Sequence, residues 1–497
     1  MFYLRTTKTA SGATAVQVVR YDYRKRIVVK HIGSAHTPED LLSLKQTARN
    51  WIEEETHQQR LFPEETKPSL TPIEKCVYLD TRYSFIYEIL SLFLRLLQFD
   101  TFHNQLLLDL VIMRIIQPVS KLESLEYLSE MFGIVYKRGR LYQTIASFSA
   151  LKDTVEKKTV VFAKQNLSFD FSIVFYDVTT LYFESFKEDD GNIRKPGFSK
   201  DNKPNQPQIV IGLIVTKEGF PVSYDVFAGN TFEGKTFIPT ICKFKATYAV
   251  KNITVVADAA MISLDNVRLL IKENLSYIVG ARVTNLKLDQ MTQIKKELED
   301  IDGRSMRIET ERGLLVCDFS FKRYQKDKQE MEKQIAKAEK LLEKKEGMKR
   351  TKFLMSKDRK KTEQVLNTDL VEKTKLLLGI KGYYTNLTGE TNKIIIDHYH
   401  NLWHVEKAFR IAKSDLAMRP IYHFKKQTIE AHVLICFMAL AVCKYMELKT
   451  GKSTKRIIKL LKSITEARMK NLLTGKIFVM RKEVPEEIKQ LWKTLLS

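Results

Sequence analysis

The chain has 497 residues, more than one ordinary hydrophobic core serves, so we expect two to four domains. Its composition, with 44% hydrophobic and 10% aromatic residues, is that of a soluble globular protein. Lys and Arg outnumber Asp and Glu by 82 to 59, a net charge of +23, which favours a polyanionic partner, nucleic acid before membrane. Charge alone leaves open a basic protein with no specific partner.

Five scattered cysteines, without a C-x-x-C pair, signal neither a disulfide framework nor a zinc site and fit a reducing cytoplasm. The opening segment MFYLRTTKTASG lacks the apolar run of a signal peptide. The most apolar segment, AHVLICFMALAVCKYMEL, is too short and too interrupted to span a bilayer. We therefore expect it to be a core helix of a cytoplasmic protein.

The first third of the chain divides into two parts. Residues 1–60 predict a small β/α unit, because the strand-like TAVQVVRYDYRKRIVVKHIG precedes the helical PEDLLSLKQTARNWIEEE. Between 83 and 166, apolar residues at three- and four-residue spacing predict helices. Basic residues collect in VYKRGRLYQTIASFSALKDTVEKK, so we interpret 83–166 as a DNA-binding region. A helical scaffold with solvated lysines is the alternative.

From 170 the pattern changes to strands, at 172–184, 209–216 and 220–227. The short KEG between the last two strands predicts an antiparallel hairpin. A helix (KTFIPTICKFKATYAV), a buried strand (NITVVADAA), a helix (SLDNVRLLIKENL) and a strand (SYIVGAR) follow. Three strands and then α, β, α, β is the order of an α/β core of the ribonuclease-H-like class, and we assign its first part to 170–282.

The next segment interrupts that order. Residues 283–378 contain a hairpin pattern, RSMRIETERGLLVCDFSF, and a highly charged helix, KQEMEKQIAKAEKLLEKKEG. We interpret them as an insertion domain, and the sequence leaves open whether this domain contacts DNA. The core resumes at 379–445 with the strand GIKGYYTNL and a long helix. The remainder, 446–497, includes the basic KSTKRIIKLLKSITEARMKNLLTGK and is predicted to be helical.

Two aspartates stand in the predicted core strands. Asp177 lies within SIVFYDVTTLYFE, where burial of a lone carboxylate among apolar side chains is costly unless a positive charge compensates it. Asp258 ends NITVVADAA, and strand ends are where α/β sheets build their sites. Taken singly, Asp258 could simply cap the next turn. Taken together, the two carboxylates indicate a shared hard cation such as Mg²⁺.

A third carboxylate is offered by the helix YHNLWHVEKAFRIAKSDL. One stripe at three- and four-residue spacing is apolar and is predicted to be buried: Leu402, Val405, Phe409, Ala412 and Leu416. A second stripe, shifted by one residue, consists of Tyr399, Trp403, Glu406, Arg410 and Lys413. Glu406 therefore stands beside the core edge, although a surface ion pair with Arg410 would explain the same spacing. For Trp403 we expect packing rather than stacking on a base.

Several ordered blocks then carry a resemblance: YDVTTLYFE, GFSKDNKPNQPQIVIGLIVTKEGFPVSYDVFAGNTFEGKT, VVADAAMIS, YIVGAR and YHNLWHVEKAFRIAKSDLAMRPIYH. Together they resemble the bacterial insertion-sequence DDE transposases, in particular the group with a Y-x2-R-x3-E-x6-K signature and a domain inserted before the glutamate. The resemblance covers most of 170–282 and 379–445 strongly, and the N-terminal third only loosely. It implies a retroviral-integrase-like catalytic core.

The resemblance places the catalytic, metal-binding triad at Asp177, Asp258 and Glu406, with two Mg²⁺ ions expected and Mn²⁺ as a substitute. The signature falls on Tyr399, Leu402, Glu406 and Lys413, and Leu402 departs from it because the family has an arginine there. His400 or Arg410 would supply the lost cation, so the expected DNA-binding residues are Tyr399, His400, Arg410 and Lys413.

The implied activity is metal-dependent cleavage and transfer of DNA strands. Water first attacks to expose a 3′-hydroxyl at the transposon end, and that hydroxyl then attacks target DNA. The expected partners are double-stranded DNA, as terminal inverted repeats and target, and a second copy of the chain in a homodimer assembled on that DNA. The expected location is the bacterial cytoplasm, at the nucleoid.

Two alternatives have support in the sequence. The segment GNTFEGKT, Gly229 to Thr236, matches the P-loop pattern of an ATPase in full, with a strand before it and a helix after it. Against it, the preceding strand looks like the second arm of a hairpin, whereas a P-loop follows a buried parallel strand. A catalytically inactive DNA-binding relative is the second alternative, and the presence of all three carboxylates disfavours it.

Overall fold

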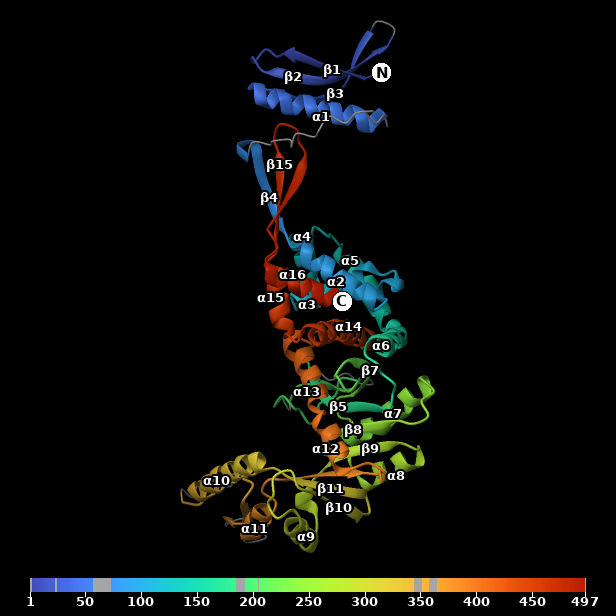
Figure 1. Ribbon diagram of the computed structural model, residues 1–497, viewed down its shortest axis with the longest axis vertical. Helices are drawn as coiled ribbons and strands as arrows, with labels where there is room; N and C mark the ends of the chain where they lie inside the picture. Colours follow the sequence, from blue (N-terminus) through green and yellow to red (C-terminus); the bar gives the residue numbers. More distant parts are fainter. Residues whose placement is uncertain are drawn as a thin grey trace. The chain divides into compact units, whose positions relative to one another are not determined.

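The computed structural model describes residues 2–22, 25–56, 73–184, 193–203, 205–343, 351–356 and 364–496. Its contacts divide the chain into two compact units. The first unit gathers residues 1–90, 125–136 and 456–497, and the second consists of residues 91–124 and 137–455 (Figure 1). The second unit therefore contains all the residues that the sequence singles out for catalysis.

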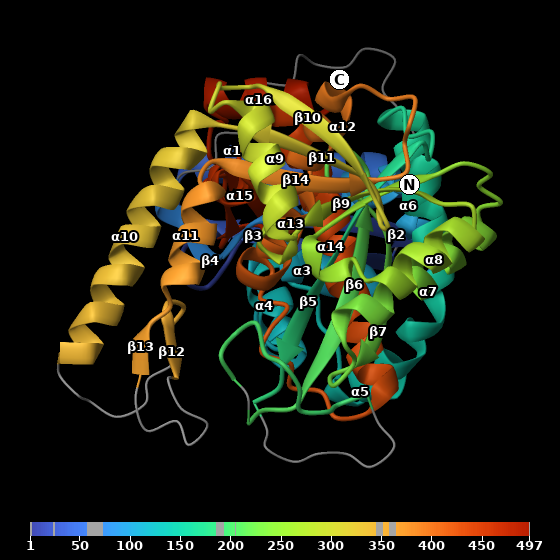
Figure 2. The same cartoon turned by 90° about the horizontal axis from the view of Figure 1, so that it is seen from below.

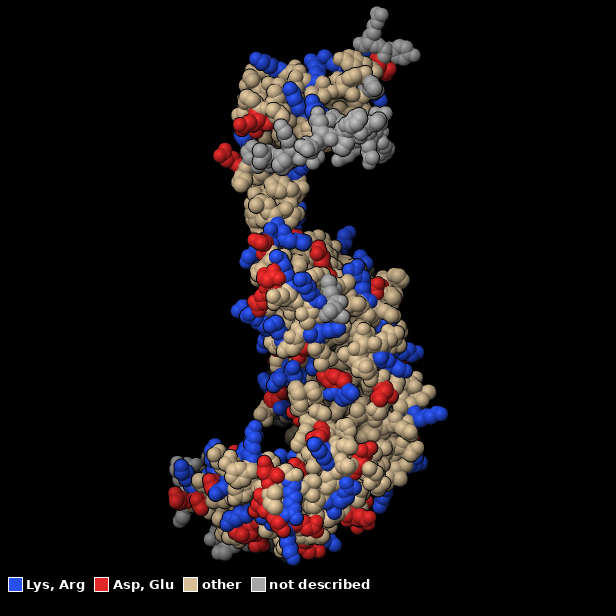
Figure 3. Space-filling view, viewed as in Figure 1, with Lys and Arg blue, Asp and Glu red and all other residues tan. Residues whose placement is uncertain are grey.

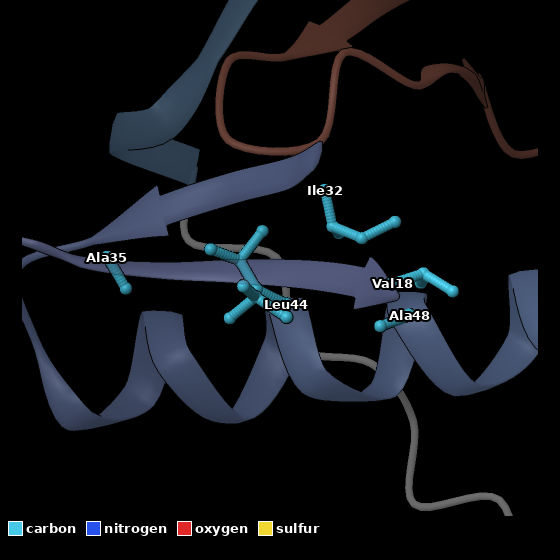
Figure 4. Close-up of a cluster of buried hydrophobic side chains, with 6 residues drawn as sticks. Val18, Ile32, Ala35, Leu44 and Ala48 are labelled. Carbon is cyan, nitrogen blue, oxygen red and sulfur yellow. The ribbon is translucent and has the colours of Figure 1, made fainter. Parts of the chain in front are cut away.

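The first unit begins with the predicted small β/α arrangement. Strands β1 (Phe2–Lys8), β2 (Thr14–Asp22) and β3 (Lys25–Ala35) form an antiparallel sheet, and helix α1 (Pro38–Thr56) packs on it. Alternate residues of the strands face the helix because side chains alternate between the faces of a sheet. Figure 4 shows the resulting core, which consists of Val16, Val18, Ile32, Ala35, Leu44 and Ala48.

The prediction that residues 446–497 are helical is wrong in its middle part. Helices α15 (Thr454–Lys462) and α16 (Glu486–Leu496) form, but β15 (Glu466–Asn471) and β16 (Ile477–Arg481) between them make a hairpin. Strand β15 also pairs with β4 (Cys76–Arg82) to give a sheet of order β16-β15-β4. A partner strand almost 400 residues away in sequence decides the conformation here, so local periodicity cannot reveal it.

The helical prediction for 83–166 is confirmed. Helices α2 (Ser84–Leu96), α3 (Gln105–Ile116), α4 (Lys121–Phe132), α5 (Arg138–Thr144) and α6 (Lys152–Asn166) occupy it, with short 3₁₀ turns between them. Helix α3 is buried on nearly all sides because it packs against α14 (Lys426–Thr450). The described residues contain one helix long and apolar enough to cross a membrane, α14, which corrects our expectation that it is too short. Its most apolar stretch is 94% buried inside the protein, as expected of a core helix.

A mixed eight-stranded sheet of order β10-β11-β14-β9-β8-β5-β6-β7 forms the centre of the second unit. Strands β5 (Ile173–Tyr182), β6 (Gln208–Val215) and β7 (Pro221–Ala228) form the predicted antiparallel meander. Strands β8 (Thr254–Ala257) and β9 (Ser276–Ala281) then extend it parallel to β5, as the crossover pattern predicts.

Helices cover both faces of this sheet (Figure 1). Helices α7 (Glu233–Thr247) and α8 (Leu264–Lys272) lie on one face, where Phe237 of α7 packs against Tyr176 of β5 with the two rings tilted. Helices α12 (Asn392–His400) and α13 (Trp403–Arg410) lie on the other face, with α12 against β8 and β9 and α13 against β5 and β6. Successive residues of β5 therefore point alternately toward α7 and toward α13.

The segment between β9 and β14 (Ile380–Thr385) both widens the sheet and adds a satellite to it. The predicted hairpin is β10 (Ser305–Thr310) and β11 (Gly313–Phe319), and β11 pairs with β14, so the hairpin extends the main sheet. Helix α9 (Leu288–Leu298) contacts the hairpin. Helices α10 (Phe321–Glu343) and α11 (Thr368–Leu376) lie beside the sheet with the short strands β12 (Leu354–Ser356) and β13 (Gln364–Leu366) (Figure 2). This satellite has a core of its own, formed by Met331, Ala338, Phe353, Val371 and Leu378.

A buried carboxylate ties helix α6 to the edge strand β7. Glu156 Oε1 accepts hydrogen bonds from the Tyr224 backbone N–H at 2.8 Å and the Ser223 hydroxyl at 3.1 Å. The Lys152 ammonium donates to the same oxygen at 2.8 Å. Glu156 thus satisfies a backbone donor that β7, as the last strand of the sheet, would otherwise leave unpaired.

We expect Glu156→Ala to lower the free energy of unfolding by about 2–4 kcal/mol, because it leaves the Tyr224 N–H without its acceptor and a partly buried Lys152 with only Asp225, at 3.6 Å. Urea denaturation followed by circular dichroism measures this loss. Asp153→Ala, an exposed acidic position one turn earlier on the same helix, is the matched control and should change stability by less than about 0.5 kcal/mol. Equal effects of the two substitutions would contradict the role given to Glu156.

Candidate active site

Asp177 points to the face of the sheet that α13 covers. Its neighbour Tyr176 points the other way, where its hydroxyl donates to Thr236 Oγ1 of α7 at 2.7 Å. Strand alternation therefore turns Asp177 toward the opposite face. Burial there raises the pKa of Asp177 from its ordinary value of 3.8 to about 6, although the nearby Lys200 lowers it in part. Asp177 is thus a carboxylate in surroundings that disfavour its charge.

Asp258 lies beside Asp177 at the end of the neighbouring parallel strand. Tyr176 pairs with Ala257, so Asp177 and Asp258 both come one residue after a paired position on strands about 4.8 Å apart. The charge of Asp258 contributes to the raised pKa of Asp177, as does the carboxylate of Glu233. The structure therefore brings together the two aspartates that the sequence singles out.

Lys200 is the main positive group near this pair, and the sequence reasoning missed it. Its ammonium donates to the Val178 carbonyl at 2.6 Å and contacts Glu233 Oε1 at 2.9 Å. Lys200 therefore divides its charge between Asp177 and Glu233, and Glu233 takes the direct ion pair. The motif GFSKDN, which contains Lys200, entered the sequence analysis only as part of a resemblance, because nothing in its spacing relates it to Asp177.

The side chain of Tyr399, on α12, approaches Asp258 across Gly280, which has no side chain to block it. The Tyr399 hydroxyl lies 3.5 Å from Asp258 Oδ1, and a Cβ added to Gly280 would stand 2.4 Å from that hydroxyl oxygen. Tyr399 is only 6% exposed, and burial together with the charge of Asp258 raises its pKa. The glycine thus allows the close approach of a tyrosine to the carboxylate.

Glu406 stands on α13 with the stripes as predicted. Leu402, Val405, Phe409, Ala412 and Leu416 are all buried. Glu406 and Arg410 are exposed on the neighbouring stripe. The predicted single long helix is in fact broken at Asn401 and Leu402, between α12 and α13, and continues after Arg410 as a π-helical turn, Ile411–Asp415. Such turns recur at functional sites.

The packing expected for Trp403 is not what the structure shows. Its side chain is 49% exposed, and its ring stacks on that of His404 with centroids 3.9 Å apart. Trp403 therefore stands in solvent one turn before Glu406 on the same stripe.

Lys381 is a second cation that the sequence reasoning missed. It lies on β14, and its ammonium is 4.5 Å from the ring centroid of Tyr399. Burial and the neighbouring Arg323 lower the pKa of Lys381, whereas Asp318, Asp258 and Glu406 raise it. Lys381 thus interacts electrostatically with both Asp258 and Glu406. The only signal in the sequence is a lysine inside the short strand GIKGYYTNL, which is too weak to identify a site.

The remaining predicted DNA-contact residues occupy different environments. His400 is exposed, and its Nε2 lies 3.3 Å from the Tyr383 hydroxyl. Lys413, in the π-helical turn, is 12% exposed and lies 3.7 Å from Asp201 Oδ1, which also contacts Arg419. A phosphate at Lys413 would therefore compete with the carboxylate of Asp201, whereas at His400 and Arg410 it would meet solvent-facing side chains.

The residues fit a hard cation in part. Asp177 and Asp258 offer oxygen ligands from two adjacent strands, and Lys200, the main positive group near Asp177, is shared with Glu233, so a divalent ion would supply further positive charge. Within the described parts of the chain, however, no group of three or more His, Cys, Asp or Glu side chains is close enough to hold a metal ion. Glu406 therefore belongs to the same face of the sheet without completing a three-carboxylate cluster.

The P-loop interpretation of Gly229 to Thr236 has no support in the fold. Strand β7 before it is antiparallel to β6 and lies at the sheet edge, and α7 begins only at Glu233. A Cβ on Gly229 would stand 2.1 Å from two backbone carbonyl oxygens, those of Lys195 and Gln208. Gly229 thus lies where chain segments pass too close together for a side chain, and this segment does not form a phosphate-binding loop.

Neighbouring carboxylates on adjacent strands, able to hold divalent ions, suit metal-dependent phosphoryl transfer. The family described as "Transposase DDE domain" matches residues 168–442, which is more than half of the chain. The chain belongs to this family: it is a DDE transposase, an enzyme of DNA transposition that cleaves and transfers DNA strands with divalent metal ions.

Two solved transposase complexes are also similar to the chain. A piggyBac transposase synaptic complex with hairpin DNA shares 11% identity over 72% of this chain and 70% of its own, with a TM-score of 0.37. A Mos1 transposase paired-end complex with the left transposon end shares 14% identity over 47% and 66%, with a TM-score of 0.16. Likenesses this low carry no argument about geometry. A comparison with curated proteins gave no match.

We expect Gly280→Ala to cost about 1–3 kcal/mol of stability, because the new methyl group would overlap the Tyr399 hydroxyl. Adding Tyr399→Phe removes the oxygen that is overlapped and should restore most of the loss. Thermal unfolding of the single and double variants measures both effects. Gly389→Ala, where no atom lies within 4 Å of the added Cβ, is the matched control. Failure of Tyr399→Phe to rescue Gly280→Ala would show that the overlap lies elsewhere.

Asp177→Asn should stabilise the protein at neutral pH. Because the pKa of Asp177 is raised to about 6, ionisation destabilises the folded state, and this cost grows as pH rises from about 4 to about 6. We expect a gain of roughly 2 kcal/mol above pH 7 in the presence of a chelator, and little gain near pH 4. Urea titrations at several pH values measure it, with the exposed Asp265→Asn as control.

Proposed function

We propose that Asp177, Asp258 and Glu406 form the catalytic, metal-binding triad of this transposase. The observation that carries the proposal is the placement of Asp177, on β5, beside Asp258, at the end of β8, with Asp177 partly buried and short of positive charge. Glu406 faces the same side of the sheet from α13, and Lys381 senses its charge together with that of Asp258. Binding of DNA and metal would draw Glu406 toward the two aspartates.

We propose Mg²⁺, replaceable by Mn²⁺, as the metal and two ions as the number. Bound there, the ions would polarise the attacking oxygen and neutralise charge on the leaving oxygen in an in-line displacement at phosphorus. Asp177 and Asp258 would hold the metal from the rigid sheet, and Glu406 from the helix. Tyr399, donating its hydroxyl to Asp258, would fix the orientation of that carboxylate. Water would be the first nucleophile and the exposed 3′-hydroxyl the second.

We further propose that Tyr399, His400, Arg410 and Lys413 serve DNA binding. On the face drawn in Figure 3, Lys and Arg side chains are interspersed with Asp and Glu rather than gathered into one patch. Net charge alone therefore does not mark a DNA path, whereas the positions of these four residues support the proposal. His400 and Arg410 are exposed next to Glu406, Tyr399 acts from the buried side, and Lys413 shares Asp201 with Arg419.

The finer organisation is part of the same proposal. We infer a ribonuclease-H-like, retroviral-integrase-like core in which 283–378 is an insertion domain, and the separate core of its satellite supports this. The proposed division is 1–60, 83–166 (DNA-binding), 170–282, 283–378, 379–445 and 446–497. The proposed substrates are the terminal inverted repeats of a bacterial insertion sequence and target DNA, bound by a homodimer in the cytoplasm at the nucleoid.

The test is cleavage of a labelled duplex carrying the element's terminal sequence, with Mg²⁺ or Mn²⁺. Asp177→Ala, Asp258→Ala and Glu406→Ala should each reduce 3′-hydroxyl formation by at least about a hundredfold while DNA affinity changes only a few-fold, because a lost metal ligand impairs chemistry before binding. Glu430→Ala, at a partly exposed position on α14, is the control.

The outcomes separate the alternatives. Unchanged cleavage in any one variant removes that residue from the triad. Binding without cleavage by the unaltered protein would identify a catalytically inactive DNA-binding relative.

A further inference from the structure

A cavity in the catalytic unit lies apart from the carboxylate site and shares no lining residue with it. It encloses about 750 Å³ among the helices, within the range of ligand-binding pockets, roughly 300–1,000 Å³. The chain between α3 and α4, helix α5, the segment 417–425 and the first turn of α14 line it. Its lining is rich in cationic and imidazole side chains: Arg114, Lys121, Arg419, His423, Lys425 and His432. Among the described residues that line it, Glu123 is the only carboxylate, and its side chain is exposed.

Within the described part of the chain, two of these basic side chains are buried without an anionic partner. Arg114 is 5% exposed and Lys121 7% exposed. The Arg114 Nη1 reaches the Leu416 and Ala417 carbonyls only at 3.4 and 3.5 Å, and its Nε finds no acceptor. A buried cation without a paired anion is costly, so a protein that retains one ordinarily uses it.

The partner of Lys121 is a neutral histidine. His432 Nε2 lies 2.9 Å from the Met418 carbonyl, to which it donates, so Nδ1 presents its lone pair to the Lys121 ammonium. The ring of His423 lies 5.7 Å from that of His432. Burial, together with Lys121 and Arg114, lowers the pKa of His423 to about 3. Burial likewise lowers the pKa of His432, so both imidazoles are neutral. Burial and the neighbouring Arg114 also lower the pKa of Lys121 well below its ordinary value, so Arg114 carries the permanent positive charge, and a bound anion would favour the charged form of Lys121.

Backbone N–H groups at the N-terminal ends of two helices add to the positive electrostatic potential of the cavity. Helix α4 begins at Lys121, and helix α14 begins at Lys426 beside the lining residues Lys425 and Thr428. The N-terminal end of a helix carries partial positive charge and unpaired N–H groups, which favour an anion. Two helices thus begin where the buried cations lie.

Aromatic rings stand at the solvent side of the cavity. Tyr142, Tyr422 and Phe424 line it and are all more than half exposed. Exposed rings of this kind are platforms on which nucleic-acid bases stack, and they accept any base because each has a π-face. The cavity therefore combines an anion site at its buried end with stacking surfaces at its mouth.

We propose that this cavity binds one unpaired nucleotide of a DNA strand, with its phosphate against Arg114 and Lys121 and its base against Tyr142, Tyr422 or Phe424. A paired nucleotide does not fit this arrangement, because its base is stacked and bonded inside the duplex. The proposal uses none of the three catalytic carboxylates, so it stands or falls separately from the proposed triad.

The test is fluorescence anisotropy with a labelled ten-nucleotide thymidine strand and with a duplex of the same length, in a chelator so that no cleavage occurs. The double variant Tyr142→Ala/Tyr422→Ala should weaken single-strand binding about tenfold or more and duplex binding less than twofold. Phe321→Ala, an exposed aromatic on α10 outside the cavity, is the matched control.

Lys121→Met examines the anion site. It should weaken single-strand binding and reduce the slope of its salt dependence by about one, since one phosphate contact is lost. Because this lysine is buried, circular dichroism must confirm that the variant folds. If it does not, the exposed double variant still decides the question.

Two results would overturn the proposal. An equal loss of single-strand and duplex binding in the double variant would assign the rings to a general DNA surface. Full competition by thymidine monophosphate, without any effect of the double variant on the labelled strand, would assign the cavity to a free nucleotide.

Discussion

The placement of two carboxylates on adjacent parallel strands is the constraint on which the rest of the catalytic unit depends. Asp177 lies on β5 and Asp258 directly follows β8, and Lys200 is shared with Glu233. Asp177 is partly buried whereas Asp258 is exposed, and burial together with the nearby like charge makes ionised Asp177 oppose folding, so the sheet must hold it there by other means. The deficit of positive charge is what makes the pair suited to a divalent ion.

The elements around Asp177 and Asp258 hold the two carboxylates in place. The strands are held from both faces, by Tyr176 against α7 and by Tyr399 of α12 passing over Gly280. The carboxylate of Glu156 accepts a hydrogen bond from a backbone N–H of the edge strand β7. A site built on such a sheet keeps its geometry without a ligand. Glu406 is different, because it stands on an exposed stripe of α13 between a helix break and a π-helical turn.

The two sites of the catalytic unit have opposite electrostatics. The carboxylate site lacks positive charge, whereas the cavity around Arg114 and Lys121 lacks negative charge. A metal ion would complete the first, and a phosphate would complete the second. The chain links them, because the segment 417–425 that lines the cavity follows the π-helical turn at the end of α13. In our proposals, divalent metal ions complete the first site and a phosphate of a DNA strand completes the second.

The sequence by itself determined the strand and helix order of the catalytic unit, the buried stripe of α13, and the positions of Asp177 within one core strand and Asp258 at the end of another. Those features follow from local periodicity, which reports which face of an element is apolar. Only the tertiary structure decided that Lys200 and Lys381 lie beside the carboxylates, that Gly280 admits Tyr399, and that β15 is a strand. Each of these depends on partners far away in sequence, and the pairing of β15 with β4 joins segments almost 400 residues apart. No local pattern records such contacts, because the residues that make them are ordinary in their own surroundings.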